Sequence, residues 1–102
     1  MSRERDRAPL DLEGPAGGRV SQFFGIVISM NYSDHAPPHF HARYDQHEAL
    51  IAIATLEVLE GWLPKRAYAL VLEWAAQHRA ELTASWDLAR EGRGPAYVVP
   101  LD

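Results

Sequence analysis

The side chains best suited to chemistry are concentrated in one short segment, Asp34–Tyr44, which contains three histidines, an aspartate and an arginine. On a strand, His39 and His41 lie on the same side with their Cβ atoms about 6 to 7 Å apart, close enough to bind one metal ion. Zinc or a related divalent ion would need a third ligand, and His35, Asp34 and His47 are the nearby donors in sequence. The Pro37-Pro38 pair stiffens the loop, which could place Asp34 or His35 close to His39 and His41. The segment therefore predicts a metal site built from Asp34, His35, His39 and His41.

The same segment also allows chemistry without a metal. Histidines change charge near neutral pH and can act as general base and general acid. With His35, His39 and His41 in those roles and Arg43 holding a phosphate, the set suits RNA cleavage. A third interpretation is an ordinary polar strand face, in which Arg43 pairs with Glu48 across a hairpin. The spacing alone leaves all three open.

Composition excludes several classes of function. The chain has 102 residues, no cysteine and a net charge of −4, so thiolate metal sites and thiol nucleophiles are ruled out. Because binding along nucleic acid depends on an excess of Lys and Arg, the acidic balance argues against a general DNA- or RNA-coating role. There is no apolar run of roughly 18 residues to cross a membrane and no signal-peptide pattern. A cytoplasmic location without a membrane partner is therefore expected.

Hydrophobic periodicity predicts the elements that position the His segment. Residues 1–20 are expected to form a flexible leader, residues 21–92 one α+β domain, and residues 93–102 a C-terminal tail. Strands are predicted at 23–32, 39–44, 48–54 and 55–60, with Phe24 on the buried face of the first. A helix begins at Pro64 and ends near Gly92. The predicted fold is thus a three- or four-stranded antiparallel sheet packed on one long C-terminal helix.

The helix prediction carries one difficulty. A helix of about 27 residues spans roughly 40 Å, which is longer than a small sheet needs. Either it breaks near Gln77-His78 or its far end packs on something else.

Several motifs together resemble a known family. They are Phe23–Ile28, Asp34–His41, Leu56–Gly61, Leu63–Arg66 and Leu72–Trp74. The chain is similar, over about residues 19–92, to small bacterial proteins of unknown function that carry an Asp-His-x-Pro-Pro-His-Phe-His signature. Members are often encoded beside a second small protein, as in toxin–antitoxin modules. The leader departs from the family pattern, and so does Ala52, opposite His39, where similar proteins often carry a polar or acidic residue.

The resemblance implies a toxin–antitoxin-like component that acts with a small partner protein. Its site would be either RNA-cleaving or a metal-assisted hydrolytic site. The alternative is a non-catalytic binding module, an antitoxin or adaptor, that uses the helix and the tail around Tyr97-Val98-Val99. RNA and a second copy of the chain are the further partners that this hypothesis allows.

Overall fold

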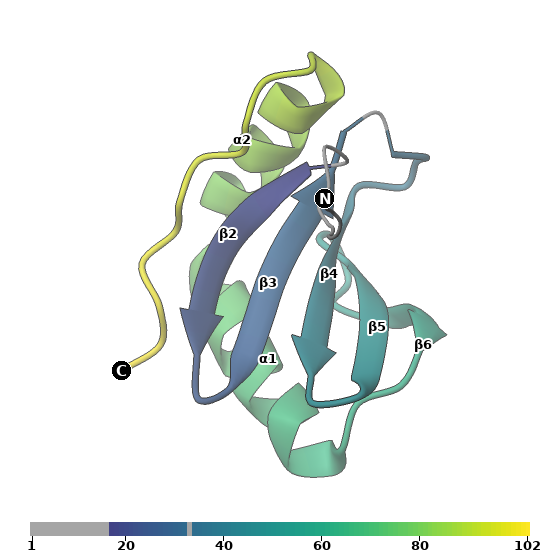
Figure 1. The fold of residues 1–102 in the computed structure, drawn as a ribbon, viewed down its shortest axis with the longest axis vertical. Helices are drawn as coiled ribbons and strands as arrows, with labels where there is room; N and C mark the ends of the chain where they lie inside the picture. Colours follow the sequence, from purple (N-terminus) through teal and green to yellow (C-terminus); the bar gives the residue numbers. More distant parts are fainter. Residues whose placement is uncertain (1–16, 33) are drawn as a thin grey trace, which may run out of the picture.

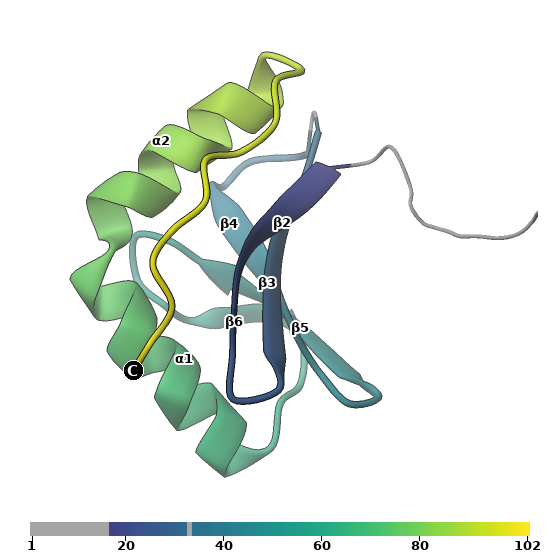
Figure 2. The same cartoon turned by 60° about the vertical axis from the view of Figure 1, so that its left-hand side comes forward.

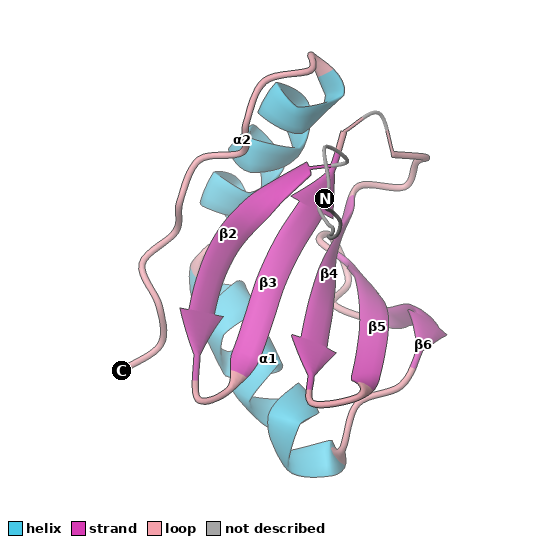
Figure 3. Ribbon diagram, in the orientation of Figure 1, coloured by secondary structure: helices cyan, strands magenta, loops and turns pink. Residues whose placement is uncertain are grey.

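The computed structural model describes residues 17–32 and 34–102, which form one antiparallel sheet and two helices (Figures 1 and 3). The strands are β2 (Gly17–Phe23), β3 (Ile26–Asn31), β4 (His39–Tyr44), β5 (His47–Ala52) and β6 (Val58–Gly61), and the helices are α1 (Lys65–Gln77) and α2 (Arg79–Arg90). The strand order β2-β3-β4-β5-β6 follows the chain, so each strand pairs with its sequence neighbour. None of the helices in the described residues is long and apolar enough to cross a membrane.

Strict alternation of side chains gives the sheet one apolar face. In β3 the side chains of Ile26, Ile28 and Met30 are fully buried, whereas the residues between them are only half-buried. In the next pair of strands Phe40 stands opposite Ile51 and Ala42 opposite Ala49, which extends the same face. Successive residues of a strand point to opposite faces, so this register leaves His41 and Arg43 on the other face.

Both helices pack on the apolar face of the sheet (Figure 2). Trp74 of α1 is completely buried, with its ring 5.1 Å from that of Phe23 and 6.1 Å from that of Phe40. Its indole Nε1 donates a hydrogen bond of 2.8 Å to the carbonyl oxygen of Val99, so the one polar atom of this ring is satisfied. Trp74 therefore joins the first helix, the sheet and the C-terminal segment.

The predicted three- or four-stranded sheet on one long helix is wrong: the sheet has five strands, and two helices cover it. The additional strand is β2, which begins in a glycine pair that is typical of a loop. A turn at Phe24 and Gly25, both with positive φ (49° and 80°), joins it to β3. Consequently Phe24 is 58% exposed, not buried as predicted.

The long helix is divided at His78, whose backbone (φ −130°, ψ 24°) leaves the helical region. The sheet explains the break, because six-residue strands span only about 20 Å and a straight helix of twice that length would overhang them. After the break, α2 buries its own apolar stripe of Leu82, Ser85, Trp86 and Ala89 against the same core. The bend places Trp86 near the start of β4.

Ordered structure begins before residue 21, and the C-terminal tail packs on the domain. Residues 1–16 of the predicted leader lie outside the described residues, and Gly17–Val20 belong to β2. The C-terminal tail runs beside β2, where the Val98 N–H donates to the Val20 carbonyl at 2.8 Å (Figure 1). Val98 is buried while Tyr97 and Val99 remain more than 60% exposed. Part of the tail that was considered for a partner contact thus completes the chain's own core.

Gly61 provides a test of how closely β6 packs on β5. Its φ is +82°, and a Cβ at this position would lie 2.0 Å from the Glu48 carbonyl oxygen. Gly92 has nearly the same φ (+79°) but no atom within 4 Å of its Cβ position. We expect Gly92→Ala to lower the free energy of unfolding by about 1–2 kcal/mol. Gly61→Ala should cost about 1–3 kcal/mol more because the backbone must also move.

Urea unfolding of the two variants measures this difference. Equal destabilisation would show that β6 does not pack closely against Glu48.

Candidate metal centre

The loop between β3 and β4 brings Asp34 against two histidines of β4. Asp34 Oδ2 lies 3.0 Å from His39 Nε2 and 3.1 Å from His41 Nε2. One ligand atom from each of these three residues lies within 4.8 Å of the other two. The two rings are 5.5 Å apart between centroids. Three donor atoms thus converge on a small region where the loop meets the strand.

Packing holds His39 in place. Only 4% of the residue is exposed, and its ring lies 5.1 Å from that of Trp86 on α2. The His41 side chain is 13% exposed and the Asp34 side chain 20%, so the centre is partly open to solvent on the Asp34 side. The bend after α1 therefore matters to the site, because it supplies the indole that covers His39.

Each histidine has an acceptor at its Nδ1 atom. His39 Nδ1 lies 2.8 Å from the carbonyl oxygen of Pro37, and His41 Nδ1 lies 2.9 Å from Glu48 Oε2. A carbonyl or a carboxylate oxygen can only accept, so a proton on each Nδ1 satisfies these two contacts. In the neutral ring the proton is then absent from Nε2. The amide Nδ2 of Asn31, a donor 3.2 Å from His41 Nε2, agrees with a lone pair there.

This arrangement turns two nitrogen lone pairs toward the same carboxylate oxygen. Acceptors do not attract one another, so something positive must lie between them. Either both imidazoles take a second proton on Nε2 and become cations, or one metal ion binds both lone pairs and the carboxylate. Outward donation from Nδ1 to a carbonyl or carboxylate is also the usual second shell of a metal-binding histidine.

The distances suit a metal ion. Zinc binds His nitrogen and carboxylate oxygen at about 2.0–2.2 Å, so neighbouring ligands of a tetrahedral ion lie about 3.3 Å apart. The two observed separations of 3.0 and 3.1 Å fall slightly short of that value. The third pair of donor atoms, from His39 and His41, lies within 4.8 Å. The residues present fit a divalent cation with three protein ligands.

Other residues singled out in the sequence lie around this centre. His35 is exposed; its backbone N–H donates to Asp34 Oδ1 at 3.1 Å, but its ring is not part of the converging group. Arg43 is exposed and stands opposite Glu48 in the register, as expected. Among the described residues, however, the Glu48 carboxylate contacts His41 and not Arg43. The structure thus groups Asp34, His39 and His41, and leaves His35 and Arg43 outside.

Sequence reasoning did not find three supporting residues: Asn31, Glu48 as a partner of His41, and Trp86. The neighbour of His41 across the ladder is Leu50, and Glu48 reaches it from a diagonal position. The diagonal position of Glu48 relative to His41 was a signal that could have revealed this contact, because long side chains reach diagonal neighbours on the adjacent strand. The Trp86 contact depends on the helix break and has no local signal.

Comparison with protein families supports the relationship suggested by the motifs. Residues 25–87, more than half of the chain, match the family model described as "Domain of unknown function (DUF4160)". The chain belongs to this family. A search of curated proteins and a search of solved structures gave no significant match. The match confirms the prediction of a family of small proteins of unknown function. The His-rich segment falls inside the matched part of this DUF4160 chain.

A pocket of about 390 Å³ opens beside the cluster of Asp34, His39 and His41. Its walls come from the loop residues Asp34–Pro37, from His39, and from Leu50, Leu59 and Glu60 on β5 and β6. A volume of this size lies within the range of small-molecule sites. The DUF4160 chain therefore has space for a small ligand next to the converging donors.

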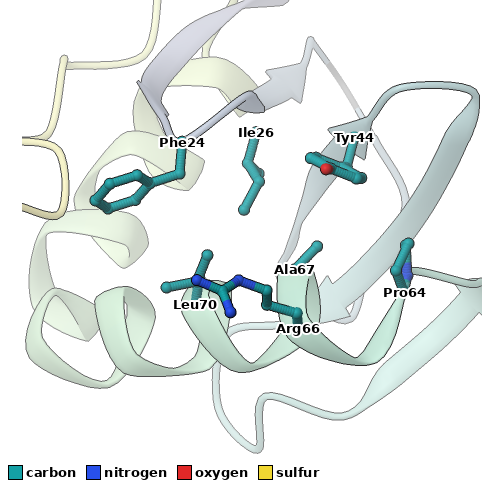
Figure 4. A pocket seen from close by; sticks show the side chains of 7 residues that line it. All are labelled: Phe24, Ile26, Tyr44, Pro64, Arg66, Ala67 and Leu70. Carbon is teal, nitrogen blue, oxygen red and sulfur yellow. The ribbon is translucent and has the colours of Figure 1, made fainter.

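A second pocket, of about 330 Å³, lies at the other end of the sheet. Phe24, Ile26 and Tyr44 from the hairpin ends face Arg66 and Leu70 of α1 across it (Figure 4). It contains no aspartate, glutamate or histidine among its described lining residues. The chemistry is therefore expected at the first pocket.

The electrostatics of Asp34 predict how stability depends on pH. Burial tends to raise the pKa of this carboxyl, but three influences outweigh burial: the His41 hydrogen bond, the His35 N–H, and the charges of protonated His39 and His41. The net pKa is below the ordinary value of 3.8. A carboxyl with a lower pKa in the folded state stabilises the fold above its unfolded pKa, and this contribution is lost as the pH falls through the folded pKa.

In the presence of a chelator, the free energy of unfolding of the wild-type protein should decrease as the pH falls from about 5 to about 2. For Asp34→Asn the decrease over the same pH range should be smaller. Urea unfolding at several pH values measures both slopes. Identical slopes would contradict the assignment of a lowered pKa to Asp34.

Proposed function

We propose that this domain binds one divalent metal ion through Asp34 Oδ2, His39 Nε2 and His41 Nε2, and uses it for hydrolysis. The observation that carries the proposal is the pair of Nε2 atoms directed at one carboxylate oxygen, at 3.0 and 3.1 Å, while both Nδ1 atoms donate elsewhere. No arrangement of two neutral imidazoles satisfies these contacts. A metal ion does so without placing two positive rings side by side.

The number of ligands favours a catalytic ion over a purely structural one. Structural zinc has four protein ligands, whereas catalytic zinc has three and keeps a position for water or substrate. Two histidines and one carboxylate form such a three-ligand set, and the 390 Å³ pocket lies directly beside it. When bound, such an ion polarises a substrate oxygen and lowers the pKa of bound water.

The protein side chains would have separate tasks in this reaction. Glu48 and the Pro37 carbonyl orient the two rings and keep their Nδ1 protons in place. Trp86 excludes water from one side of His39. His35 is exposed on the pocket wall, where it can exchange a proton between a substrate and solvent.

The cellular setting that we propose is a toxin–antitoxin-like module in the cytoplasm, in which the site is controlled by a partner protein. The hydrolytic interpretation is preferred to metal-free RNA cleavage because Arg43, the expected phosphate ligand, is not among the residues that line the pocket. The alternative of a non-catalytic binding module draws support from exposed Phe24 and Tyr44 near the second pocket.

Metal binding is tested by titrating untagged, chelator-treated protein with Zn²⁺ in a calorimeter. Wild type should bind one equivalent, and His39→Ala or His41→Ala should weaken binding by more than about 100-fold, since each removes a direct ligand. Glu48→Ala should weaken it by about 10- to 100-fold, because Glu48 only orients a ligand.

The chain offers matched controls for that titration. His47 contacts Trp62 and His78 contacts Glu81, both away from the centre, so His47→Ala and His78→Ala should bind as wild type does. His35→Ala should also retain the ion. Stoichiometric binding that survives the His39→Ala/His41→Ala double substitution would contradict the site.

The cellular role is tested by expression in a bacterial host. Wild type should arrest growth, His39→Ala should not, and co-expression of the protein encoded next to it should restore growth. Normal growth of both strains would argue against a toxin. Arrest by both would show that the toxicity does not depend on His39, which would argue against a hydrolytic role for this site.

A further inference from the structure

One wall of the pocket beside the proposed metal site consists of residues that are not metal ligands. That wall consists of Leu50 on β5 and Leu59 and Glu60 on β6, facing the Asp34–Pro37 loop. Glu60 pairs with Leu50 in the ladder, and the register shifts directly after this pair. The shift brings both Leu59 and Glu60 to the pocket from neighbouring positions of a short edge strand. The chemistry of these three side chains therefore determines which kind of ligand can bind beside the ion.

The charge of the wall disfavours phosphate. Two carboxylates, Asp34 and Glu60, line the pocket, and its described lining residues include no lysine or arginine. Sites for phosphate esters normally present arginine, lysine or backbone N–H groups to the anion. The domain as a whole carries a net charge of −4, which adds to the repulsion. A bound divalent ion would attract a phosphodiester, but the two carboxylates offset its charge, and no lysine or arginine of the described lining adds to it.

The remaining surface suits an apolar group. Leu59 is 43% exposed although it is a large aliphatic side chain, and Leu50 is only half-buried. With Pro37 they supply the apolar side of a pocket of about 390 Å³. Burial of an aromatic or branched aliphatic group against such a surface is worth about a factor of ten or more in affinity.

From these features we infer that the pocket takes an uncharged, partly apolar ligand whose carbonyl group binds the metal, such as an amide or ester, and not a phosphate ester. The carbonyl oxygen would lie at the ion, and the apolar group would lie against Leu50 and Leu59. Glu60 would accept a hydrogen bond from an N–H of the ligand. This inference rests on the proposed metal site and specifies its substrate class.

The test uses the full chain loaded with Co²⁺, because the visible spectrum of the ion reports what enters its coordination sphere. Co²⁺ binding is measured first. Benzohydroxamate, which binds metal through its carbonyl and deprotonated N–O oxygens, is then compared with phenylphosphonate, which has the same ring but a more highly charged phosphonate, and each affinity is taken relative to that of the same ligand for free Co²⁺. We expect benzohydroxamate to bind at least about tenfold more tightly.

Matched variants assign the preference to the wall. Leu59→Ala should weaken benzohydroxamate about tenfold but leave acetohydroxamate, which lacks the ring, almost unchanged. Val58→Ala shortens an exposed apolar side chain of the same strand outside the pocket lining, and it should bind both as wild type does. Glu60→Gln should improve phenylphosphonate binding several-fold.

The outcomes are distinguishable. Equal or tighter binding of phenylphosphonate, or no spectral response to either ligand by the Co²⁺-loaded protein, would overturn the inference while leaving the metal site standing. Failure of Co²⁺ to bind would overturn the proposed function, and the inference with it.

Discussion

Two imidazole rings donate their Nδ1 protons outward, to the Pro37 carbonyl and to Glu48, and this leaves both Nε2 atoms directed at one oxygen of Asp34. The surrounding residues must therefore satisfy both ring nitrogens of His39 and of His41. Buried polar groups are costly unless each finds a partner, and here the last partner has to be a cation. A proton on each ring and one shared metal ion are two arrangements that satisfy these contacts, and the second is the one that we propose.

The fold provides this constraint through elements that are distant in sequence. The β4–β5 register places Glu48 diagonally across from His41, and β3 supplies Asn31 beside it. The helix break at His78 lets α2 pass over the end of the sheet, where Trp86 covers His39. Gly61 lets β6 approach the Glu48 backbone, so the edge strand that forms the pocket wall is tied to a residue whose side chain also contacts His41.

Local patterns in the sequence were sufficient for the central hairpin. Alternation of apolar residues predicted β4 with its observed bounds, and a tight hairpin turn predicted the pairing of Arg43 with Glu48. The spacing of His39 and His41 also predicted that their rings lie together. These features depend on a period of two and a tight turn, which residue types in one short segment determine.

Features set by long-range packing were not predictable in the same way. Gly17-Gly18 and nearby charges concealed β2, whose strand state depends on pairing with β3. The helical stripe continues through His78 without a local stop signal, so only the length of the helix relative to a small sheet suggested a break near Gln77-His78, as one of two alternatives. The choice of Asp34 over His35 depends on the path of a proline-containing loop. In each case the deciding contact lies outside the segment that would have to reveal it.

The most direct test of the metal centre is long-range ¹H–¹⁵N NMR of the five histidine rings, recorded with and without one equivalent of Zn²⁺. His39 and His41 should keep their Nδ1 protons throughout, and their Nε2 resonances alone should shift when zinc is added. Unchanged Nε2 resonances for these two rings, or zinc-induced shifts at His35, His47 or His78 instead, would contradict the proposed site.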